Sequence, residues 1–261
     1  TPDGARVMYT DNVKHTVRVV DWDGSNDRLL AENSVGLTVW RDPETDIQWV
    51  YLRPAKGKEW NQKSKPITRI RLDNPDMSEL VWDKKSVSNT WFQLSPDGKY
   101  CATAMFWPSC GYATFPNGEF RKIDKGCWTA MAPDDSYRMW VFDGDHRRVK
   151  LFNLAGEKIA TIDVHECEGV NGWEIYFPRW SNHLRFITVA GPFSDNRDHA
   201  CDMSKWKSYL PEGACNLIRQ GGYNCELHLG KLSPDLTRVE KWLRITHNGK
   251  ADFHGDAWIG S

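Results

Sequence analysis

Short runs of β-branched and aromatic residues alternate with polar clusters along the whole chain, and no stretch has the period of a long amphipathic helix. Residues 6–9 and 16–21 predict two strands that are separated by a polar connection. The same arrangement returns at residues 37–40 and 47–52, and further strands are predicted at 67–72 and 79–82. The pattern therefore predicts an all-β protein built from repeated groups of short strands.

Turn-forming residues divide the chain at regular intervals. Pro2, Pro43, Pro96, Pro133 and Asn182 each mark the first hairpin turn of a group. These positions lie about 40–50 residues apart, which is the period of the four-stranded blades of a β-propeller. The sequence therefore predicts five blades, of which the fourth begins at residues 127–131 and the fifth at 172–177.

The two ends of the chain look like halves of one repeat. Residues 253–259 predict a strand, and Thr1-Pro2-Asp3-Gly4 predicts the turn that would follow it. Pairing of the N- and C-terminal segments would then complete the first blade and close the ring. We expect residues 1–261 to form a single five-bladed β-propeller domain of four-stranded antiparallel blades, with a long loop insertion at 192–224 in the last blade.

The turn units resemble the TolB/WD40-like (PD40-type) propeller repeat, in which Trp-x-x-Ser-Pro-Asp-Gly-Lys precedes an apolar strand. The resemblance is good at residues 94–99 and 1–4, partial at 132–135 and weaker at 42–43 and 180–182. Proline presets the first φ of this turn, aspartate caps it, and glycine takes the positive φ. The resemblance implies the fold and does not choose a function, because PD40-type propellers include periplasmic binding proteins, peptidase accessory domains and some pectin-fragment lyases.

A second motif lies at residues 40–43. Trp40-Arg41-Asp42-Pro43 resembles the Arg-Asp-Pro signature of five-bladed glycosidases of the fructosidase and arabinanase type. In those families the aspartate opens an inner strand, whereas here Asp42 is expected in the turn after the inner strand. The motif is therefore interpreted as another copy of the Pro-Asp turn, and it argues little for hydrolysis.

Composition narrows the class of partner. The net charge is −1 and no charge run is long, so neither nucleic acid nor an anionic membrane is indicated. No apolar run reaches the ~18 residues of a membrane span. We expect a monomer, and we interpret a chain that starts at Thr1 as a mature or trimmed fragment. The 14 tryptophans suit both a repeat core and a stacking surface for sugars.

Seven cysteines without metal-site spacing favour a secreted or periplasmic protein with two or three disulfides. The alternative is a cytosolic protein with seven reduced thiols. Cys101 is the candidate for a buried free thiol because it lies in a predicted core strand. Candidate disulfides are Cys201–Cys215 within the insertion and Cys110–Cys127 on neighbouring blades, while Cys167 could pair with Cys225 or with neither.

Propeller geometry selects a candidate site without further information. The starts of inner strands and the loops between second and third strands share one face, around the central channel. At this face we expect a carbohydrate or other polar small ligand, with tryptophan stacking on a sugar and charged groups binding hydroxyls or a carboxylate. The candidate ligand-binding residues are Trp107, Asp143, His146, Arg147 and Trp258.

Other interpretations of this face stay open. The protein could be a polysaccharide-active hydrolase or lyase in which Glu174 and Asp256 act as acid and base. No cofactor is certain, but His254 and Asp256 could hold a divalent metal. Structural roles compete with each of these: Asp143 and Arg147 could simply tie their loop down, and His254 could be a hydrogen-bonded channel residue. A protein-interaction scaffold that uses the rim is a third possibility, and the insertion could act as a lid.

Overall fold

The computed structural model describes residues 1–11, 13–55, 66–84, 92–105, 107–167, 174–193, 225–248, 252 and 255–260. The chain divides into two compact units, residues 1–141 and 142–261, and the boundary falls within β13 (Met139–Phe142). The elements in these ranges are all strands, so the described residues include no helix that could cross a membrane. The single domain predicted from the sequence stays a prediction.

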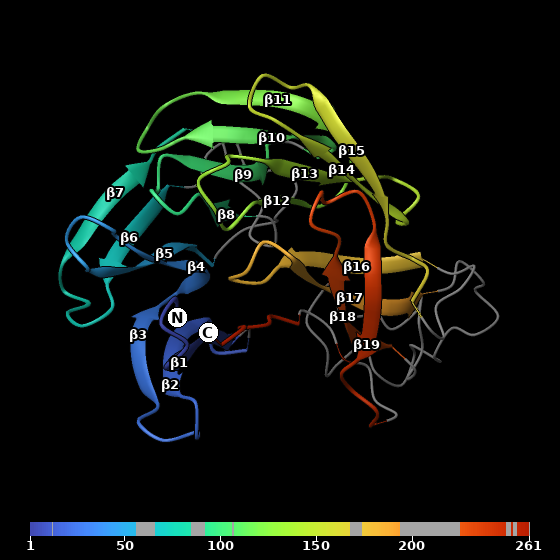
Figure 1. The fold of residues 1–261 in the computed structure, drawn as a ribbon. Helices are drawn as coiled ribbons and strands as arrows, with labels where there is room; N and C mark the ends of the chain where they lie inside the picture. Colours follow the sequence, from blue (N-terminus) through green and yellow to red (C-terminus); the bar gives the residue numbers. More distant parts are fainter. Residues whose placement is uncertain are drawn as a thin grey trace, which may run out of the picture. The chain divides into compact units, whose positions relative to one another are not determined.

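The strands form five antiparallel sheets that follow one another along the chain (Figure 1). The first sheet contains β1 (Arg6–Asp11), β2 (Thr16–Asp21) and β3 (Arg28–Glu32). The second contains β4 (Ser34–Arg41), β5 (Gln48–Pro54), β6 (Ile67–Arg71) and β7 (Ser78–Trp82). The third contains β8 (Gln93–Leu94), β9 (Tyr100–Ala104), β10 (Ser109–Thr114) and β11 (Phe120–Lys125).

The last two sheets have the same plan. The fourth contains β12 (Thr129–Met131), β13, β14 (Arg148–Phe152) and β15 (Lys158–Asp163). The fifth contains β16 (Glu174–Trp180), β17 (Phe186–Phe193), β18 (Glu226–Leu232) and β19 (Val239–Arg244). Within each sheet, every strand pairs with the next strand in the chain, which is the meander of a propeller blade. The predicted fold class, a five-bladed β-propeller, is confirmed.

The Pro-Asp turns lie where the sequence places them. Between β8 and β9, Ser95 donates a 2.7 Å hydrogen bond to the carboxylate of Asp97, and Gly98 has a φ of 72°. Between β4 and β5, the carboxylate of Asp42 accepts bonds from the Glu44 amide (2.9 Å) and the Thr45 hydroxyl (2.8 Å). The assignment of Asp42 to a turn, and not to the start of an inner strand, is therefore confirmed.

Buried aromatic residues join the second sheet to the third. Trp82, at the end of β7, stacks on Phe115 with ring centroids 5.2 Å apart. Tyr51 contacts both Phe92 (5.7 Å) and Phe115 (6.5 Å). Burying a side chain as large as Trp82 stabilises the fold by roughly 3 kcal/mol. This core fixes the end of β7 against the third sheet, and Trp82 there also lines a hollow in the surface.

The first sheet and the C-terminal segment depart from the predicted plan. The first sheet has three strands, and residues 255–260 form no strand. The amide side chain of Asn182 instead bonds both the N–H of Ile259 (2.6 Å) and its carbonyl (3.0 Å), and Thr188 donates a 2.6 Å bond to the Gly255 carbonyl. These side chains hydrogen-bond to N–H and C=O groups that would otherwise pair with a neighbouring strand. Closure of the ring by the two termini stays a prediction.

The described cysteines form no disulfide. The predicted Cys110–Cys127 pair is absent, and the Cys110 thiol donates a hydrogen bond (3.5 Å) to the Cys127 carbonyl. Cys101 is a fully buried free thiol, as predicted. Cys167 and Cys225 are also buried thiols that do not pair with each other. The predicted Cys201–Cys215 pair and most of the insertion at 192–224 lie outside the described residues.

Candidate functional site

The turn from Asp143 to Arg148 in the second unit holds three of the predicted ligand-binding residues. The Asp143 carboxylate is buried and accepts hydrogen bonds from the backbone amides of Arg147 (2.9 Å) and Arg148 (3.2 Å). The Asp143 amide in turn donates to the Arg148 carbonyl at 2.9 Å. Asp143 thus holds the turn between β13 and β14 together, which is the structural role that the sequence left open.

His146 is packed between aromatic rings. Its imidazole stacks on Phe142, with centroids 5.6 Å apart and planes within 5°, and it meets the edge of Tyr176 at 4.4 Å. Its carbonyl accepts a 3.0 Å bond from the amide of Ile175, near the start of β16. The carbonyl of Arg147 accepts a 2.9 Å bond from Val164. The turn is therefore built firmly into the fourth and fifth sheets.

The other predicted residues of the second unit lie near its C-terminal segment or beyond the description. Trp258 is 44% exposed. The carboxylate of Asp256 lies 3.7 Å from the guanidinium of Arg179 in a solvent-exposed ion pair. Glu174 begins β16, but its side chain lies outside the described part of the structure, and so does His254. The catalytic and metal roles predicted for these residues stay predictions.

No metal centre is apparent among the described side chains. They include no group of three or more histidine, cysteine, aspartate or glutamate residues placed to hold an ion. His254, one of the two predicted ligands, is outside those ranges.

Trp107 belongs to the first unit and is 55% exposed. It lies in the short loop between β9 and β10, two residues from Met105 and two from Ser109. Both of these neighbours line a hollow of about 470 Å³ in the surface of the first unit. Trp107 is therefore the predicted ligand-binding residue whose near neighbours in the sequence line this hollow.

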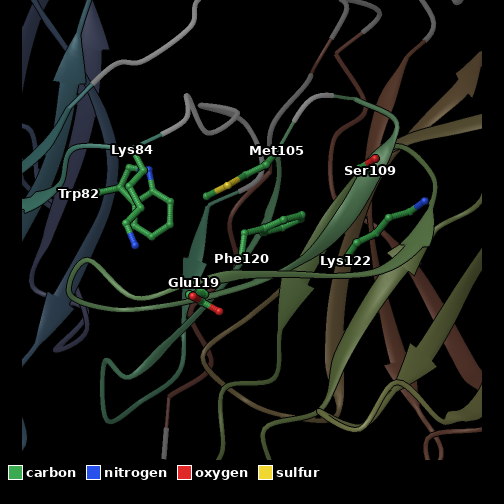
Figure 2. A pocket seen from close by; sticks show the side chains of 7 residues that line it. All are labelled: Trp82, Lys84, Met105, Ser109, Glu119, Phe120 and Lys122. Atoms are coloured by element: carbon green, nitrogen blue, oxygen red, sulfur yellow. The ribbon is translucent and has the colours of Figure 1, made fainter.

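The hollow lies where the last strand of the second sheet meets the third sheet. Figure 2 shows its seven lining side chains, which come from the end of β7 and the segment after it, from the loop between β9 and β10, from β10, and from β11 and the turn before it. Three of them are apolar, three are charged and one is a hydroxyl. They are Trp82, Met105, Phe120, Lys84, Glu119, Lys122 and Ser109.

Local contacts fix the β7 side of the hollow. The ammonium of Lys84 donates a 2.5 Å hydrogen bond to the Gly118 carbonyl and lies 5.7 Å from the centre of the Trp82 ring. The amide of Asp83 donates to the side chain of Asn117 at 3.2 Å. The segment that follows β7 is thus attached to the turn between β10 and β11, so the two walls of the hollow are held together.

A bulge in the third sheet shapes the other wall. The pairing of β10 with β11 shifts between Cys110 and Gly111, and Gly111 faces Lys122 across the two strands. A Cβ atom at Gly111 would collide with the Arg121 carbonyl, so only glycine lets β11 come this close. Ser109 and Gly111 lie on one face of β10, and Lys122 faces Gly111, so Ser109 and Lys122 both reach the hollow from the same face of the sheet.

The charged residues of the hollow differ in whether they already have a partner within the protein. Lys84 is bound to a backbone carbonyl, as described above. Lys122 and Glu119 are both exposed, and neither forms an ion pair with another described residue. The hollow therefore offers one uncommitted ammonium, one uncommitted carboxylate and one hydroxyl around an apolar floor.

Sequence reasoning missed most of these residues. A single aromatic residue, Phe120, stands among the charged residues Glu119, Arg121 and Lys122, and this cluster was a signal that could have been used. The pairing of this segment with Trp82 and Lys84 could not be inferred, because about 35 residues separate them and their contact depends on how two sheets pack.

No family model matches the sequence, and no curated protein matches it either. Solved structures are similar in fold. A protein of unknown function from Bacteroides caccae matches with a TM-score of 0.51 and 12% identity, over 94% of this chain and 79% of that chain. This likeness concerns the fold alone.

Two further matches have lower TM-scores. A gluconolactonase from Xanthomonas campestris has a TM-score of 0.49 and 11% identity over 72% of this chain, and the match spans 66% of the gluconolactonase chain, just under two thirds. Regucalcin, a calcium-binding protein from Agrobacterium tumefaciens, has a TM-score of 0.38 and 11% identity over 79% of this chain and 83% of that chain. The propeller fold that the TolB/WD40-like resemblance implies is present, whereas no family model confirms membership of that family.

Proposed function

We propose that this protein is a ligand-binding β-propeller that binds a carbohydrate in the hollow of its first unit. The observation that carries the proposal is the mixed lining of the hollow. Ligand sites of about 300–1,000 Å³ are typically lined by apolar side chains with a few well-placed polar groups. The hollow of about 470 Å³, with three apolar and four polar side chains, has this composition.

A sugar suits such a lining because a pyranose ring has an apolar C–H face and a polar rim of hydroxyl groups. Met105 and Phe120 offer an apolar surface, while Ser109 and Glu119 offer a donor and an acceptor for hydroxyl groups. Trp107 is not itself one of the seven lining residues, but it lies in the loop between Met105 and Ser109, which are, and its indole is 55% exposed. We propose that a sugar that extends beyond the hollow stacks on this indole.

The proposal moves the site from the turn at 143–148 to the first unit. Asp143 and His146 are engaged in holding the turn between β13 and β14. The hollow is instead lined by residues in or next to β7 and β11 and by Met105 and Ser109, at the two ends of the loop between β9 and β10. A secreted or periplasmic location and a monomeric state accompany the proposal as predictions.

Calorimetric titration with a panel of oligosaccharides tests the proposal. We expect at least one oligosaccharide to bind the wild-type protein, and Trp107→Ala to weaken this binding about tenfold, which corresponds to about 1.4 kcal/mol. Trp22→Ala is the matched control, because Trp22 is 69% exposed in the same unit but lies far along the chain, between β2 and β3. Equal losses in both variants, or no binding of any saccharide, would contradict the proposal.

A further inference from the structure

We infer that the saccharide bound in the hollow is acidic, and that Lys122 and Ser109 hold its carboxylate. This inference rests on the proposed function and specifies its ligand class. It depends on which charged side chains of the hollow already bind another group of the protein and which do not.

The two lysines of the hollow differ in their contacts. The ammonium of Lys84 donates to the Gly118 carbonyl at 2.5 Å, so this lysine joins the end of β7 to the third sheet. Lys122 has no such partner among the described residues, and its side chain projects from the outermost strand of the third sheet. Lys122 is therefore the cation that a bound anion would meet.

Ser109 completes a pair of donors. Ser109 begins β10, where it faces Lys125, and Lys122 on β11 faces Gly111. Because Gly111 lies two residues along β10 from Ser109, the side chains of Ser109 and Lys122 emerge on the same face of the sheet. Figure 2 shows Ser109 and Lys122 on neighbouring strands at one side of the hollow. An ammonium and a hydroxyl that line the same hollow can each donate to one oxygen of a carboxylate, and a hydrogen bond with an ionised partner is about twice as strong as a neutral one.

The remaining side chains fit the rest of a uronic acid. Glu119 is an acceptor without a charged partner among the described residues, and sugar hydroxyls are donors. Met105 and Phe120 form the apolar floor on which the C–H face of the ring can lie. The carboxylate of Glu119 repels a negative charge placed next to it, so the lining favours a sugar residue whose carboxylate lies at Lys122 and whose hydroxyl groups lie at Glu119.

The test compares acidic saccharides with neutral counterparts of the same stereochemistry. Tetramers of galacturonate, glucuronate and mannuronate are titrated in the calorimeter beside the same tetramers whose carboxylates have been reduced to primary alcohols. We expect one uronate to bind about tenfold more tightly than its reduced counterpart, and this preference to shrink when the NaCl concentration is raised from 50 to 500 mM.

Matched variants assign the preference to Lys122. Lys122→Gln should remove the tenfold preference for the acidic over the reduced tetramer, and Lys122→Arg should keep it. Lys158→Gln is the control, because Lys158 is an exposed lysine on β15, the outermost strand of the next sheet. It should leave both affinities unchanged.

The outcomes separate the two claims. Equal binding of acidic and reduced tetramers would overturn the acidic ligand and leave the carbohydrate-binding function standing. A preference for uronates that survives in Lys122→Gln would overturn the role of Lys122. No binding of any tetramer or of any other saccharide would overturn the proposed function together with this inference.

Discussion

The hydroxyl of Tyr137 donates a 2.7 Å hydrogen bond to the carboxylate of Asp97. Asp97 caps the turn between β8 and β9, and Tyr137 lies in the turn between β12 and β13, so this bond joins the third sheet to the fourth. A similar bond of 2.7 Å runs from the side chain of Gln48 to Asp3 and joins the second sheet to the N-terminal turn. The aspartates of the Pro-Asp turns thus bind neighbouring repeats as well as their own backbone.

Removing this hydroxyl should loosen the junction between the two sheets. Tyr137→Phe deletes the donor and leaves the carboxylate of Asp97 short of one partner, so we expect it to lower the free energy of unfolding by about 1 kcal/mol in urea titrations. Tyr9→Phe is the control, because Tyr9 donates to the exposed Asp27 within the first sheet. An equal loss in both variants would contradict a special role for the junction.

Asp97 should also make the stability depend on pH in the acid range. Burial opposes its ionisation, but hydrogen bonds from Tyr137, Ser95 and the Lys99 amide outweigh burial and lower the pKa of Asp97 from 3.8 to about 2. A lowered folded-state pKa stabilises the fold above pH ~4 and stops doing so as the pH falls through about 2. Wild type should therefore lose its stability advantage over Asp97→Asn between pH 5 and pH 2. An advantage that stays constant over this range would contradict the assignment.

The bulge at Gly111 should be intolerant of any side chain. An added Cβ would meet the backbone of Arg121 and Lys122, so Gly111→Ala should lower the free energy of unfolding by about 2 kcal/mol and displace β11. Because β11 carries Phe120 and Lys122, saccharide binding should weaken as well. Gly144→Ala, where nothing lies within 4 Å of the added carbon, should change stability by less than about 0.5 kcal/mol. Normal stability of Gly111→Ala in the same urea titration would show that β11 can move away freely.

The buried thiols should resist alkylation in the folded protein. Burial raises the pKa of Cys101 well above its usual value and that of Cys167 to about 12, so the reactive thiolate is scarce at pH 8. Peptide mapping after iodoacetamide treatment should find both residues unmodified in buffer and modified in urea. Rapid modification of Cys101 in buffer would contradict its complete burial.

The repeat was predictable because its signals are local. Proline, aspartate and glycine in the turn at Pro96 fix backbone angles whatever surrounds them, and this turn and its relatives lie where expected. The C-terminal segment was not predictable, because Asn182 and Thr188 bind its backbone from a distant part of the chain.

The candidate site was predictable only in part. Trp107 was selected from its place in a loop between second and third strands, and it lies beside Met105 and Ser109 of the hollow. Asp143 was selected by the same rule, yet its carboxylate serves the backbone of its own turn. Loop position identifies which residues lie at one face of a propeller. It cannot show which of their side chains bind the protein's own backbone and so are not available to a ligand.

Hydrogen–deuterium exchange with and without the tightest-binding saccharide tests the central claim most directly. We predict that the ligand slows exchange in residues 105–109 and 119–122, which border the hollow, and leaves the turn at 143–148 unchanged. Protection confined to 143–148 and 255–260, with none around the hollow, would contradict the proposed site and return it to the face that the sequence first suggested.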